Sequence, residues 1–304
     1  MAPVVQESKH CSSAKEFLDK ILSIGGKNND RRWLFRGQGR DWPLLPSLFR
    51  AEASKKIRSL TNRNYEDDFQ LWLTERDLFV DYFDMLDRRG LVIPDNSRTL
   101  RLYIESIRIK NYTGKFGVDA GFIASEEQCW PLLGLMQHYG VPTRLLDWSR
   151  QPLTAAFFSA DGGAKIQSKS SNEKIVVWAL HYPTLGVKTS SVKNSFSLRV
   201  IFVPSAPNPN LAAQQGVFTL MHPRHTEEEK GVYRALEDVF LNPHKMKFRR
   251  DAEFIVLRKI TVPVSEAKEV LRLLERFDIT PSFIYPGYQS IVDDIRNQIM
   301  WERQ

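Results

Sequence analysis

The chain has 304 residues, which is enough to bury a large core in one big domain or two small ones. A hydrophobic content of 42% and a charged content of 26% are typical of a soluble globular protein, and the sequence shows neither a membrane-spanning apolar run nor a signal-peptide pattern. The formal net charge of +7 favours an anionic partner or ligand, although many basic proteins bind no nucleic acid.

The N-terminal segment is expected to form a helical extension of the main domain. Its first ten residues are polar and are expected to fray. Ser12 or Ser13 can cap a helix over residues 14–24, where apolar side chains recur on one face. No linker divides the rest of the chain, so residues 1–32 are interpreted as the extension and residues 33–304 as a single α+β domain.

The aromatic and apolar run Trp33–Gln38 predicts a short buried strand. Alternation along a strand places Arg36 and Gln38 on the same face. Gly37 between them leaves room for a close approach to the backbone. An arginine at a strand end beside a glycine suits the binding of a phosphate or a carboxylate. Residues 42–50 are too rich in proline for a helix and are expected to run extended.

Helices and short buried strands alternate in the remaining pattern. The clearest helix covers Tyr65–Arg89, whose apolar side chains recur at three- and four-residue spacing. Glu75 lies within it and is expected to be a solvated helix charge. Further helices are predicted over residues 126–139, 153–160, 267–274 and 290–304, and strands over residues 174–181, 198–203, 217–220, 254–262 and 283–286.

Two charged stretches give less definite patterns. Residues 91–119 are ambiguous, and residues 224–242 are expected to be helical in part. The first stretch carries four basic residues: Arg98, Arg101, Arg108 and Lys110. They form either part of a nucleic-acid surface or a solvated helix face, which is the commoner outcome for such a pattern.

A polar corner at residues 137–148 lies between two apolar runs. Gly140 permits a positive φ, and Pro142 fixes its own φ and keeps its predecessor out of the helical region. Five side chains that can bind a ligand fall within the corner: Gln137, His138, Tyr139, Arg144 and Asp147. Two interpretations stay open. The corner holds polar groups in a cleft, or Arg144 pairs with Asp147 to stabilise a buried turn.

Several familiar kinds of site are missing. The sequence contains no glycine-rich dinucleotide or phosphate-binding loop, no zinc-protease motif and no serine-hydrolase motif. His222 and His225 are three residues apart without an obvious further ligand, so no metal site is expected. Cys11 and Cys129 offer neither a metal quartet nor a disulfide framework, so an intracellular, reducing compartment is expected. Cys129 lies in an apolar helix and is expected in the core.

Four motifs, in this order along the chain, resemble the FRG domain family, which is named for its Phe-Arg-Gly triplet. They are Trp33-Leu-Phe-Arg-Gly-Gln38, Trp42-x-Leu-x-Pro46-Ser-x-x-Arg50, Gln137-His-Tyr-Gly-x-Pro-Thr-Arg-Leu-Leu-Asp-Trp148 and Gln214-x-Gly-x-Phe-Thr219. The central motif makes the resemblance specific, and the similarity runs from about Trp33 to about Ile291. Two positions depart from the family. Asn210 stands where an arginine or a similar residue is usual, which argues against a phosphate contact there, and Gln151 stands where asparagine is usual.

The resemblance implies an ADP-ribosyltransferase-like split β core and NAD-dependent ADP-ribosyl transfer onto adenine bases in DNA, in the setting of a toxin or anti-phage defence. NAD would be the co-substrate, and nicotinamide the leaving group. The DNA would be single-stranded or would present a flipped base, because a base inside a duplex is hard to reach. The expected cofactor-binding residues are Phe35, Arg36, Gly37, Gln38, Tyr139 and Arg144, with Arg36 at the pyrophosphate and Tyr139 stacked on nicotinamide.

The same hypothesis assigns catalytic roles. Loss of nicotinamide leaves an oxocarbenium-like ribose, which a nearby carboxylate or amide can stabilise. Three candidates for this role stay open, because Asp147 lies in the central motif, Gln214 precedes one predicted strand and Glu253 begins another. His138 is the candidate general base that accepts a proton from the attacking amine.

The hypothesis depends on convergence, because Arg36, Tyr139 and Gln214 must line one pocket shaped for a dinucleotide. Two alternatives use the same residues. A non-catalytic nucleic-acid or nucleotide-binding module would bind DNA in a salt-sensitive manner without turning over NAD. An NAD-glycohydrolase or nuclease-type effector would consume NAD, or cleave strands, without forming a covalent adduct.

Overall fold

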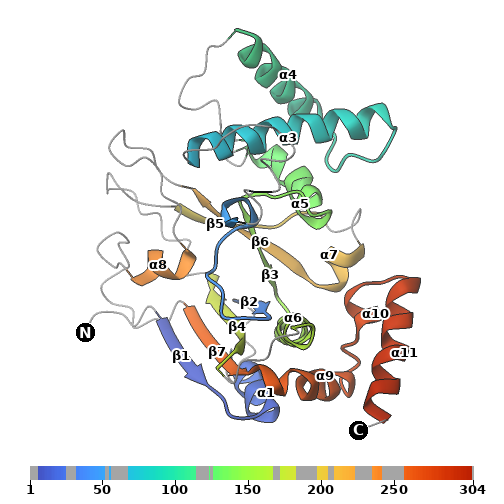
Figure 1. Cartoon of the computed structure of the whole chain (residues 1–304). Coiled ribbons are helices and arrows are strands. Elements are labelled where there is room, and N and C mark those ends of the chain that lie inside the picture. Colours follow the sequence, from blue (N-terminus) through green and yellow to red (C-terminus); the bar gives the residue numbers. More distant parts are fainter. Residues whose placement is uncertain are drawn as a thin grey trace.

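A seven-stranded sheet forms the centre of the computed structural model (Figure 1). The structure describes residues 6–24, 32–51, 55, 68–113, 123, 126–166, 172–182, 197–204, 209–222, 235–241 and 257–302. The strands are β1 (Gln6–His10), β2 (Trp33–Gln38), β3 (Leu145–Ser149), β4 (Lys174–His181), β5 (Ser197–Ile201), β6 (Gly216–His222) and β7 (Leu257–Pro263). Their order across the sheet is β1-β7-β4-β2-β3-β6-β5. β1 and β7 run parallel and the other neighbours antiparallel, which confirms a mixed fold of helices and strands.

The sheet consists of two halves that meet between β2 and β3. These two strands share a single Cα pair, Phe35 with Ser149. By contrast, β2 pairs with β4 along all six of its residues, and β3 pairs with β6 along all five. We call the junction between β2 and β3 the seam. Few backbone hydrogen bonds cross the seam, so side chains contribute much of the contact between the halves.

Helices surround the sheet and lie mainly toward its two ends (Figure 1). α3 and α4 lie at one end, and α1, α9, α10 and α11 lie toward the other. The helices are α1 (Ala14–Leu22), α3 (Asp68–Arg88), α4 (Arg98–Thr113), α5 (Trp130–His138), α6 (Pro152–Ala164), α7 (Pro209–Ala213), α8 (Leu236–Leu241), α9 (Ala267–Glu275), α10 (Pro281–Ile284) and α11 (Tyr288–Glu302). Short 3-10 turns cover Ser47–Phe49, Glu127–Cys129 and Val264–Glu266.

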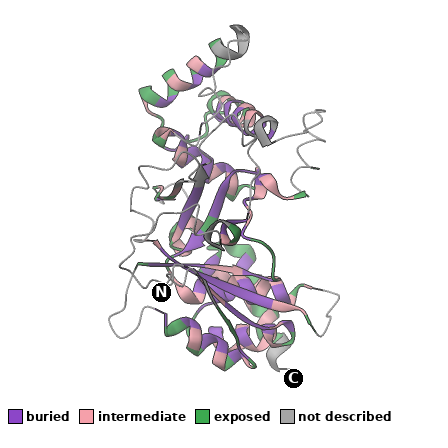
Figure 2. Cartoon of the chain, turned by 90° about the vertical axis from the view of Figure 1, so that its left-hand side faces the viewer, coloured by how far each residue is buried: buried purple, intermediate pink, exposed green. Residues whose placement is uncertain are grey.

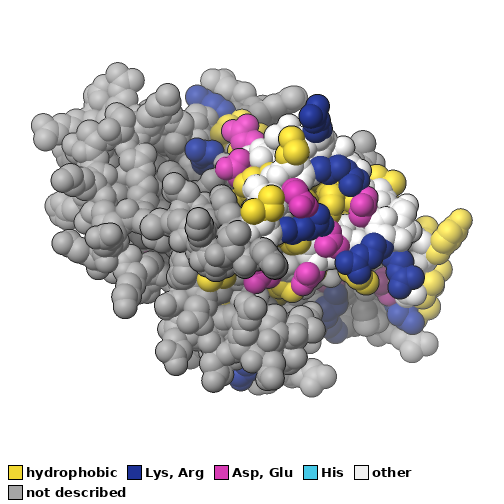
Figure 3. All heavy atoms as spheres, turned by 90° about the horizontal axis from the view of Figure 1, so that it is seen from above, with side chains coloured by type: hydrophobic (Ala, Val, Ile, Leu, Met, Phe, Trp, Pro, Cys, Tyr) yellow, Lys and Arg dark blue, Asp and Glu magenta, His cyan; other side chains and the backbone are white. Residues whose placement is uncertain are grey.

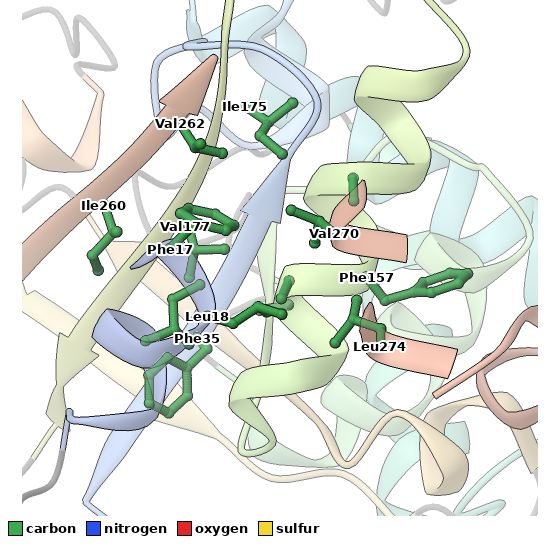
Figure 4. Close-up of a cluster of buried hydrophobic side chains, with 14 of the residues drawn as sticks. Phe17, Leu18, Phe35, Phe157, Ile175, Val177, Ile260, Val262, Val270 and Leu274 are labelled. Atoms are coloured by element: carbon green, nitrogen blue, oxygen red, sulfur yellow. The ribbon is translucent and has the colours of Figure 1, made fainter. Parts of the chain in front are cut away.

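The largest core lies between one face of the sheet and α1, α6 and α9 (Figure 4). Alternation along β4 sends Ile175 and Val177 into this core and Val176 and Trp178 to the opposite face. Figure 2 shows the resulting pattern, in which the strands are mostly buried and the exposed residues lie on the outer helices. The side chains labelled in Figure 4 are Phe17, Leu18, Phe35, Phe157, Ile175, Val177, Ile260, Val262, Val270 and Leu274.

A second core joins the helical end to the other half of the sheet. Side chains of α3, α4 and α5 pack there against Leu145 of β3, Ile201 of β5 and Phe218 of β6. Cys129 is fully buried in this core, and burial raises the pKa of its thiol. The prediction that Cys129 is a core residue is therefore confirmed.

Gly37 allows β2 to approach α6 closely. A Cβ atom at this position would lie 1.9 Å from the backbone oxygen of Ala155 and 2.7 Å from the backbone nitrogen of Ser159. The same contact continues at Gly39, where a Cβ atom would lie 2.5 Å from the backbone of Gly162. The expectation that Gly37 leaves room for a close approach to the backbone is confirmed, and α6 is the element that approaches.

Residues 6–10, within the segment that was expected to fray, form β1 and extend the sheet. Polar residues suit this edge strand, because it pairs with β7 through its backbone while Ser8, Lys9 and His10 are exposed. The Cys11 N–H continues the pairing by donating to the carbonyl of Thr261 at 2.8 Å. α1 then places Phe17 and Ile21 in the main core, with Ser13 as its N-cap. β1 and α1 thus join the main sheet and its core.

The predicted strand over residues 283–286 is wrong, because α10 covers residues 283 and 284 and no strand includes residues 285 and 286. Thr280 caps the helix by accepting a hydrogen bond from the N–H of Phe283, and Pro281 takes its first position. These capping signals decide the local structure over the short apolar run. Strand β3, in contrast, was not predicted at all, since its sequence was interpreted as part of the polar corner.

The other predicted elements agree with the structure to within a few residues. They are the helices over 14–24, 65–89, 126–139, 153–160, 267–274 and 290–304 and the strands over 33–38, 174–181, 198–203 and 217–220. The ambiguous stretch contains α4, and α8 supplies the described helix of residues 224–242. Residues 254–256 of the remaining predicted strand lie outside the described part of the chain.

Candidate functional site

A pocket of about 720 Å³ opens beside the seam. One wall is formed by the segment from Trp42 to Ala51, and another by the corner after α5. Arg36 and Asp147, from the two strands that flank the seam, also line the pocket. A volume of this size lies within the range of small-molecule binding sites.

Arg36 bridges the seam. Its Nη1 atom donates to the backbone carbonyl of Asp147 at 2.8 Å and lies 3.5 Å from the carboxylate Oδ2 of the same residue. Burial lowers the pKa of the Arg36 guanidinium from its usual value; Asp147 opposes this shift, and Arg50 adds to it. The guanidinium stays protonated nevertheless, as arginine does in proteins. The pocket thus contains a fixed positive charge beside β3.

Gln137 at the end of α5 orients the carboxylate of Asp147. Its Nε2 atom donates to Oδ2 of Asp147 at 2.8 Å and to the carbonyl of Leu145 at 3.1 Å. Its Oε1 atom accepts a hydrogen bond from the hydroxyl of Thr143. Sequence reasoning named Gln137 as able to bind a ligand but gave it no role. In the structure, the Gln137 amide holds the carboxylate of Asp147 in place by a hydrogen bond.

Ser47 ties the two walls of the pocket together. Its hydroxyl donates to the carbonyl of Thr143 at 3.2 Å and accepts from the N–H of the same residue at 3.1 Å. The N–H of Leu48 also donates to the Thr143 carbonyl, at 3.1 Å. These contacts join two of the four sequence motifs through Ser47 and Thr143, which are 96 residues apart in the chain.

Arg144 has a structural role. Its backbone N–H and its side-chain Nε both donate to the carboxylate of Glu75 in α3, and both side chains are buried. Arg144 is not among the described residues that line the pocket, and its expected role in binding the cofactor stays a prediction. The alternative pairing of Arg144 with Asp147 is wrong, and so is the interpretation of Glu75 as a solvated charge, because its exposed fraction is 0%.

His138 and Tyr139 lie on the exposed side of the corner. The two rings pack edge to face at 5.0 Å, and Nε2 of His138 lies 3.3 Å from Nδ2 of Asn210. Burial lowers the pKa of the His138 imidazole, and Asp147 opposes this shift. The ring is therefore neutral at pH 7, as a general base must be. Tyr139 is 69% exposed and is not among the described residues that line the pocket.

Gln214 points away from the pocket. Its Nε2 atom donates to the carbonyl of Ile284 in α10 at 3.2 Å, and its own carbonyl accepts from the hydroxyl of Ser149 at 2.7 Å. The described lining of this pocket includes Arg36 but neither Tyr139 nor Gln214. Glu253 lies outside the described residues.

The other members of the Phe-Arg-Gly segment support the fold. Phe35 lies in the main core. Gln38 shares the face of Arg36, as predicted, and its Oε1 atom accepts from Nε1 of Trp178 at 3.0 Å. Gly37 packs on α6. Of this segment, Arg36 is the described residue that lines the pocket, and the roles of the other three in binding a cofactor stay predictions.

Sequence reasoning missed Trp42 and Arg50 as parts of the site. Both line the pocket, and Arg50 is oriented by the bond from its Nε to the carbonyl of Leu45 at 2.9 Å. The family-like motif that contains them was the available signal, because it pairs an aromatic residue with an arginine on a proline-rich segment. Among the described lining residues, two arginines and one carboxylate carry charge, which favours an anionic ligand.

The basic residues of α4 form a solvated face with acidic partners. Arg101 pairs with Asp87 at 2.7 Å, and Arg108 pairs with Asp84 and Glu105. Figure 3, which views this end of the molecule, shows basic and acidic side chains interspersed. The solvated-face interpretation therefore holds for these two arginines.

Two further observations limit the kinds of site in the described part of the chain. Among these residues, no three His, Cys, Asp or Glu side chains gather as a metal ion would require. No helix within the same ranges combines the length and the apolar character needed to cross a membrane.

Comparison with known proteins identifies one family. Residues 98–168 match the family model for the FRG domain, which confirms the predicted resemblance over this part of the chain. The matched region contains the whole corner at 137–148, with Gln137, His138 and Asp147, but neither the Phe-Arg-Gly segment nor Gln214. No curated protein and no solved structure gives a significant match.

Proposed function

We propose that this protein is an NAD-dependent ADP-ribosyltransferase that modifies adenine bases in DNA and releases nicotinamide. The FRG domain match supports the proposal, because the central motif of the matched region forms one wall of the pocket. The two-part sheet is also compatible with the split β core that such an enzyme would have.

The observation that carries the proposal is the position of Arg36. Its guanidinium lies in a pocket of nucleotide size, between a second arginine and a carboxylate that Gln137 orients. Arg36 and Arg50 suit the two phosphates of a dinucleotide. Asp147 supplies the negative charge that an oxocarbenium-like ribose needs.

The chemistry assigns roles to Asp147, which lines the pocket, and to His138, which lies on the exposed side of the corner. The amine of an adenine base attacks the anomeric carbon of the ribose, and the bond from that carbon to nicotinamide breaks with its electron pair leaving on nicotinamide. Asp147 stabilises the positive charge that develops on the ribose. His138, neutral at pH 7, accepts the proton that the amine loses.

Mass spectrometry tests the proposal directly. The protein is incubated with NAD and a single-stranded oligonucleotide that contains adenine, and the DNA is digested to nucleosides. We expect an ADP-ribosylated deoxyadenosine and an equal amount of free nicotinamide. An oligonucleotide without adenine gives neither product. A complete absence of adduct in every DNA tested would reject the proposal.

Matched arginine variants connect the activity to the pocket. Arg36→Ala is expected to lower the rate of nicotinamide release about tenfold or more, since hydrogen bonds to charged groups contribute about 1.5–3 kcal/mol. Arg296→Ala is the control, because Arg296 forms an exposed pair with Asp293 on α11. Circular dichroism and melting curves establish that each variant folds.

A second candidate is a nucleotide-binding module without catalytic activity. The hydrogen bonds from Arg36 and Gln137 to Asp147 favour this candidate, because a carboxylate with a purely structural role at the seam would make the same bonds. This candidate predicts NAD binding without release of nicotinamide. Nicotinamide release without a DNA adduct would indicate a glycohydrolase instead.

A further inference from the structure

Trp42 presents an exposed indole ring on the wall of the pocket. The residue is 53% exposed and lines the same cavity as Arg36 and Arg50. A single exposed aromatic residue is common on protein surfaces and needs no ligand to explain it. The surroundings of Trp42 therefore decide whether its position has a function.

Hydrogen bonds to the start of α8 anchor the segment that carries Trp42. Leu44 is fully buried, and its N–H donates to the carboxylate of Glu237 at 3.0 and 3.2 Å. The carbonyl of Leu44 accepts from the N–H of Leu236 at 3.0 Å, so two hydrogen-bonding contacts join this segment to the start of α8. Pro43 fixes the backbone between the indole and this anchor. A ring presented on a fixed backbone loses little conformational freedom when a ligand stacks on it.

The pocket thus combines one flat aromatic surface with two guanidinium groups. Among its described lining residues, Trp42 is the aromatic one, since Tyr139 lies outside. A flat base joined to phosphates is the ligand chemistry that matches this combination, because bases stack on indole rings and phosphates bind arginine. Arg36, beside Asp147, faces the seam, and Arg50 belongs to the same segment as Trp42.

We propose that Trp42 is the surface on which the adenine ring of an adenine dinucleotide stacks, while Arg36 and Arg50 bind its phosphates. The identity of the ligand rests on the proposed function. The proposed function places the reacting ribose at Asp147 and the phosphates at the two arginines. Trp42 is then the aromatic lining residue that is available to stack on adenine. Trp42 therefore replaces Tyr139 as the aromatic contact with the ligand.

Calorimetric titration with two overlapping fragments of the dinucleotide tests this assignment. The probes are ADP-ribose, which contains adenine, and nicotinamide mononucleotide, which does not. Trp42→Ala is expected to weaken ADP-ribose binding about 5- to 150-fold, the range for loss of one base stack. Trp42→Phe, which keeps a flat ring, is expected to retain most of the affinity. Tyr139→Ala is the control and is expected to bind ADP-ribose as the wild type does.

The mononucleotide distinguishes the two ends of the ligand. Its affinity is expected to be equal for the wild type and Trp42→Ala. An equal loss of affinity for both probes would overturn the assignment to adenine. Unchanged ADP-ribose binding by Trp42→Ala would overturn any stacking role for this residue. Melting curves of each variant exclude loss of folding, and Trp42→Phe keeps the test valid if the alanine variant is unstable.

The outcome separates this inference from the proposed function. If Trp42→Ala loses ADP-ribose binding and the wild type forms no DNA adduct, the stacking role stands and the transferase proposal fails. If the adduct forms and Trp42→Ala binds ADP-ribose normally, the transferase proposal stands and the stacking role fails. If the wild type binds neither probe, the stacking role fails, and the presence or absence of the adduct alone decides the transferase proposal.

Discussion

The carboxylate of Glu75 in α3 accepts the backbone N–H of Arg144 at 2.8 Å and also binds the side-chain Nε of Arg144. Both residues are buried, with exposed fractions of 0% and 1%. Arg144 immediately precedes β3, which carries Asp147. The pair therefore fixes the helical end of the molecule to the strand that forms one side of the pocket.

Removal of this carboxylate should destabilise the fold strongly. Glu75→Ala removes the buried carboxylate that accepts from both the backbone N–H and the Nε of Arg144, and broken buried pairs cost about 3–5 kcal/mol. Urea denaturation measures the change in the free energy of unfolding. Asp87→Ala, which removes an exposed pair from the same helix, is the control and should leave the unfolding midpoint nearly unchanged. Equal effects of the two substitutions would contradict the structural role of Glu75.

A methyl group at Gly37 should also destabilise the fold. Gly37→Ala places a Cβ atom 1.9 Å from the backbone oxygen of Ala155, so β2 and α6 must move apart. Overpacking of this kind costs about 1–3 kcal/mol or more. Gly287→Ala is the matched control, because a Cβ atom there meets no atom within 4 Å. Thermal unfolding of the two variants measures the difference, and a wild-type melting temperature for Gly37→Ala would contradict the close packing.

Glu237 should make stability depend on pH. Burial raises the pKa of its carboxyl above the usual value of 4.5, although its hydrogen bond from Leu44 opposes the shift. The folded state therefore holds the proton more tightly than the unfolded state, and stability falls as the pH rises through the raised pKa. Glu237→Gln keeps an oxygen that can accept from Leu44 but cannot ionise.

Melting temperatures measured between about pH 4 and pH 7 test whether stability falls with increasing pH as expected. The wild type should lose stability relative to Glu237→Gln as the pH increases over this range. A difference that stays constant, or that changes in the opposite direction, would show that the carboxylate is not destabilised by burial.

The imidazole of His138 should titrate below its usual pKa of 6.5, because burial disfavours its charged form. Asp147 opposes this shift, so Asp147→Asn should lower the pKa of His138 further. Titration of the histidine ring protons by NMR measures both values without requiring catalysis. If His138 is the general base, nicotinamide release in the wild type rises with pH through the same pKa and is constant above it. An increase in the pKa of His138 on substitution of Asp147 would contradict the electrostatic link between them.

Local patterns predicted most helices and strands, because the spacing of apolar residues and the capping residues are properties of short segments. They indicated β4 as a buried strand and α3 as an amphipathic helix. They could not identify the partner of Glu75, because periodicity gives the face of a helix and not the group 69 residues away that meets it. For the same reason the sequence placed Arg144 and Gln214 in the site, although their side chains bind Glu75 and the backbone of α10.

Two strands escaped prediction for different physical reasons. β1 is polar because it is an edge strand, held by backbone pairing with β7 and not by an apolar face. β3 is short, and Asp147 interrupts its apolar residues, so its pattern resembles a polar turn. The role of Arg36 was accessible because strand alternation and an adjacent glycine both mark it, yet its contact with Asp147 spans 111 residues and depends on the sheet order.

Because β2 and β3 share a single residue pair, Arg36 has a structural role as well as a chemical one. Its guanidinium crosslinks the two strands where the backbone hydrogen-bond ladder between them is nearly interrupted. Amide hydrogen exchange in both strands should therefore become faster in Arg36→Ala, which lacks this crosslink, even without any nucleotide. A bound dinucleotide that spans the two strands would slow that exchange, so the exchange rate of the sheet would itself measure ligand binding.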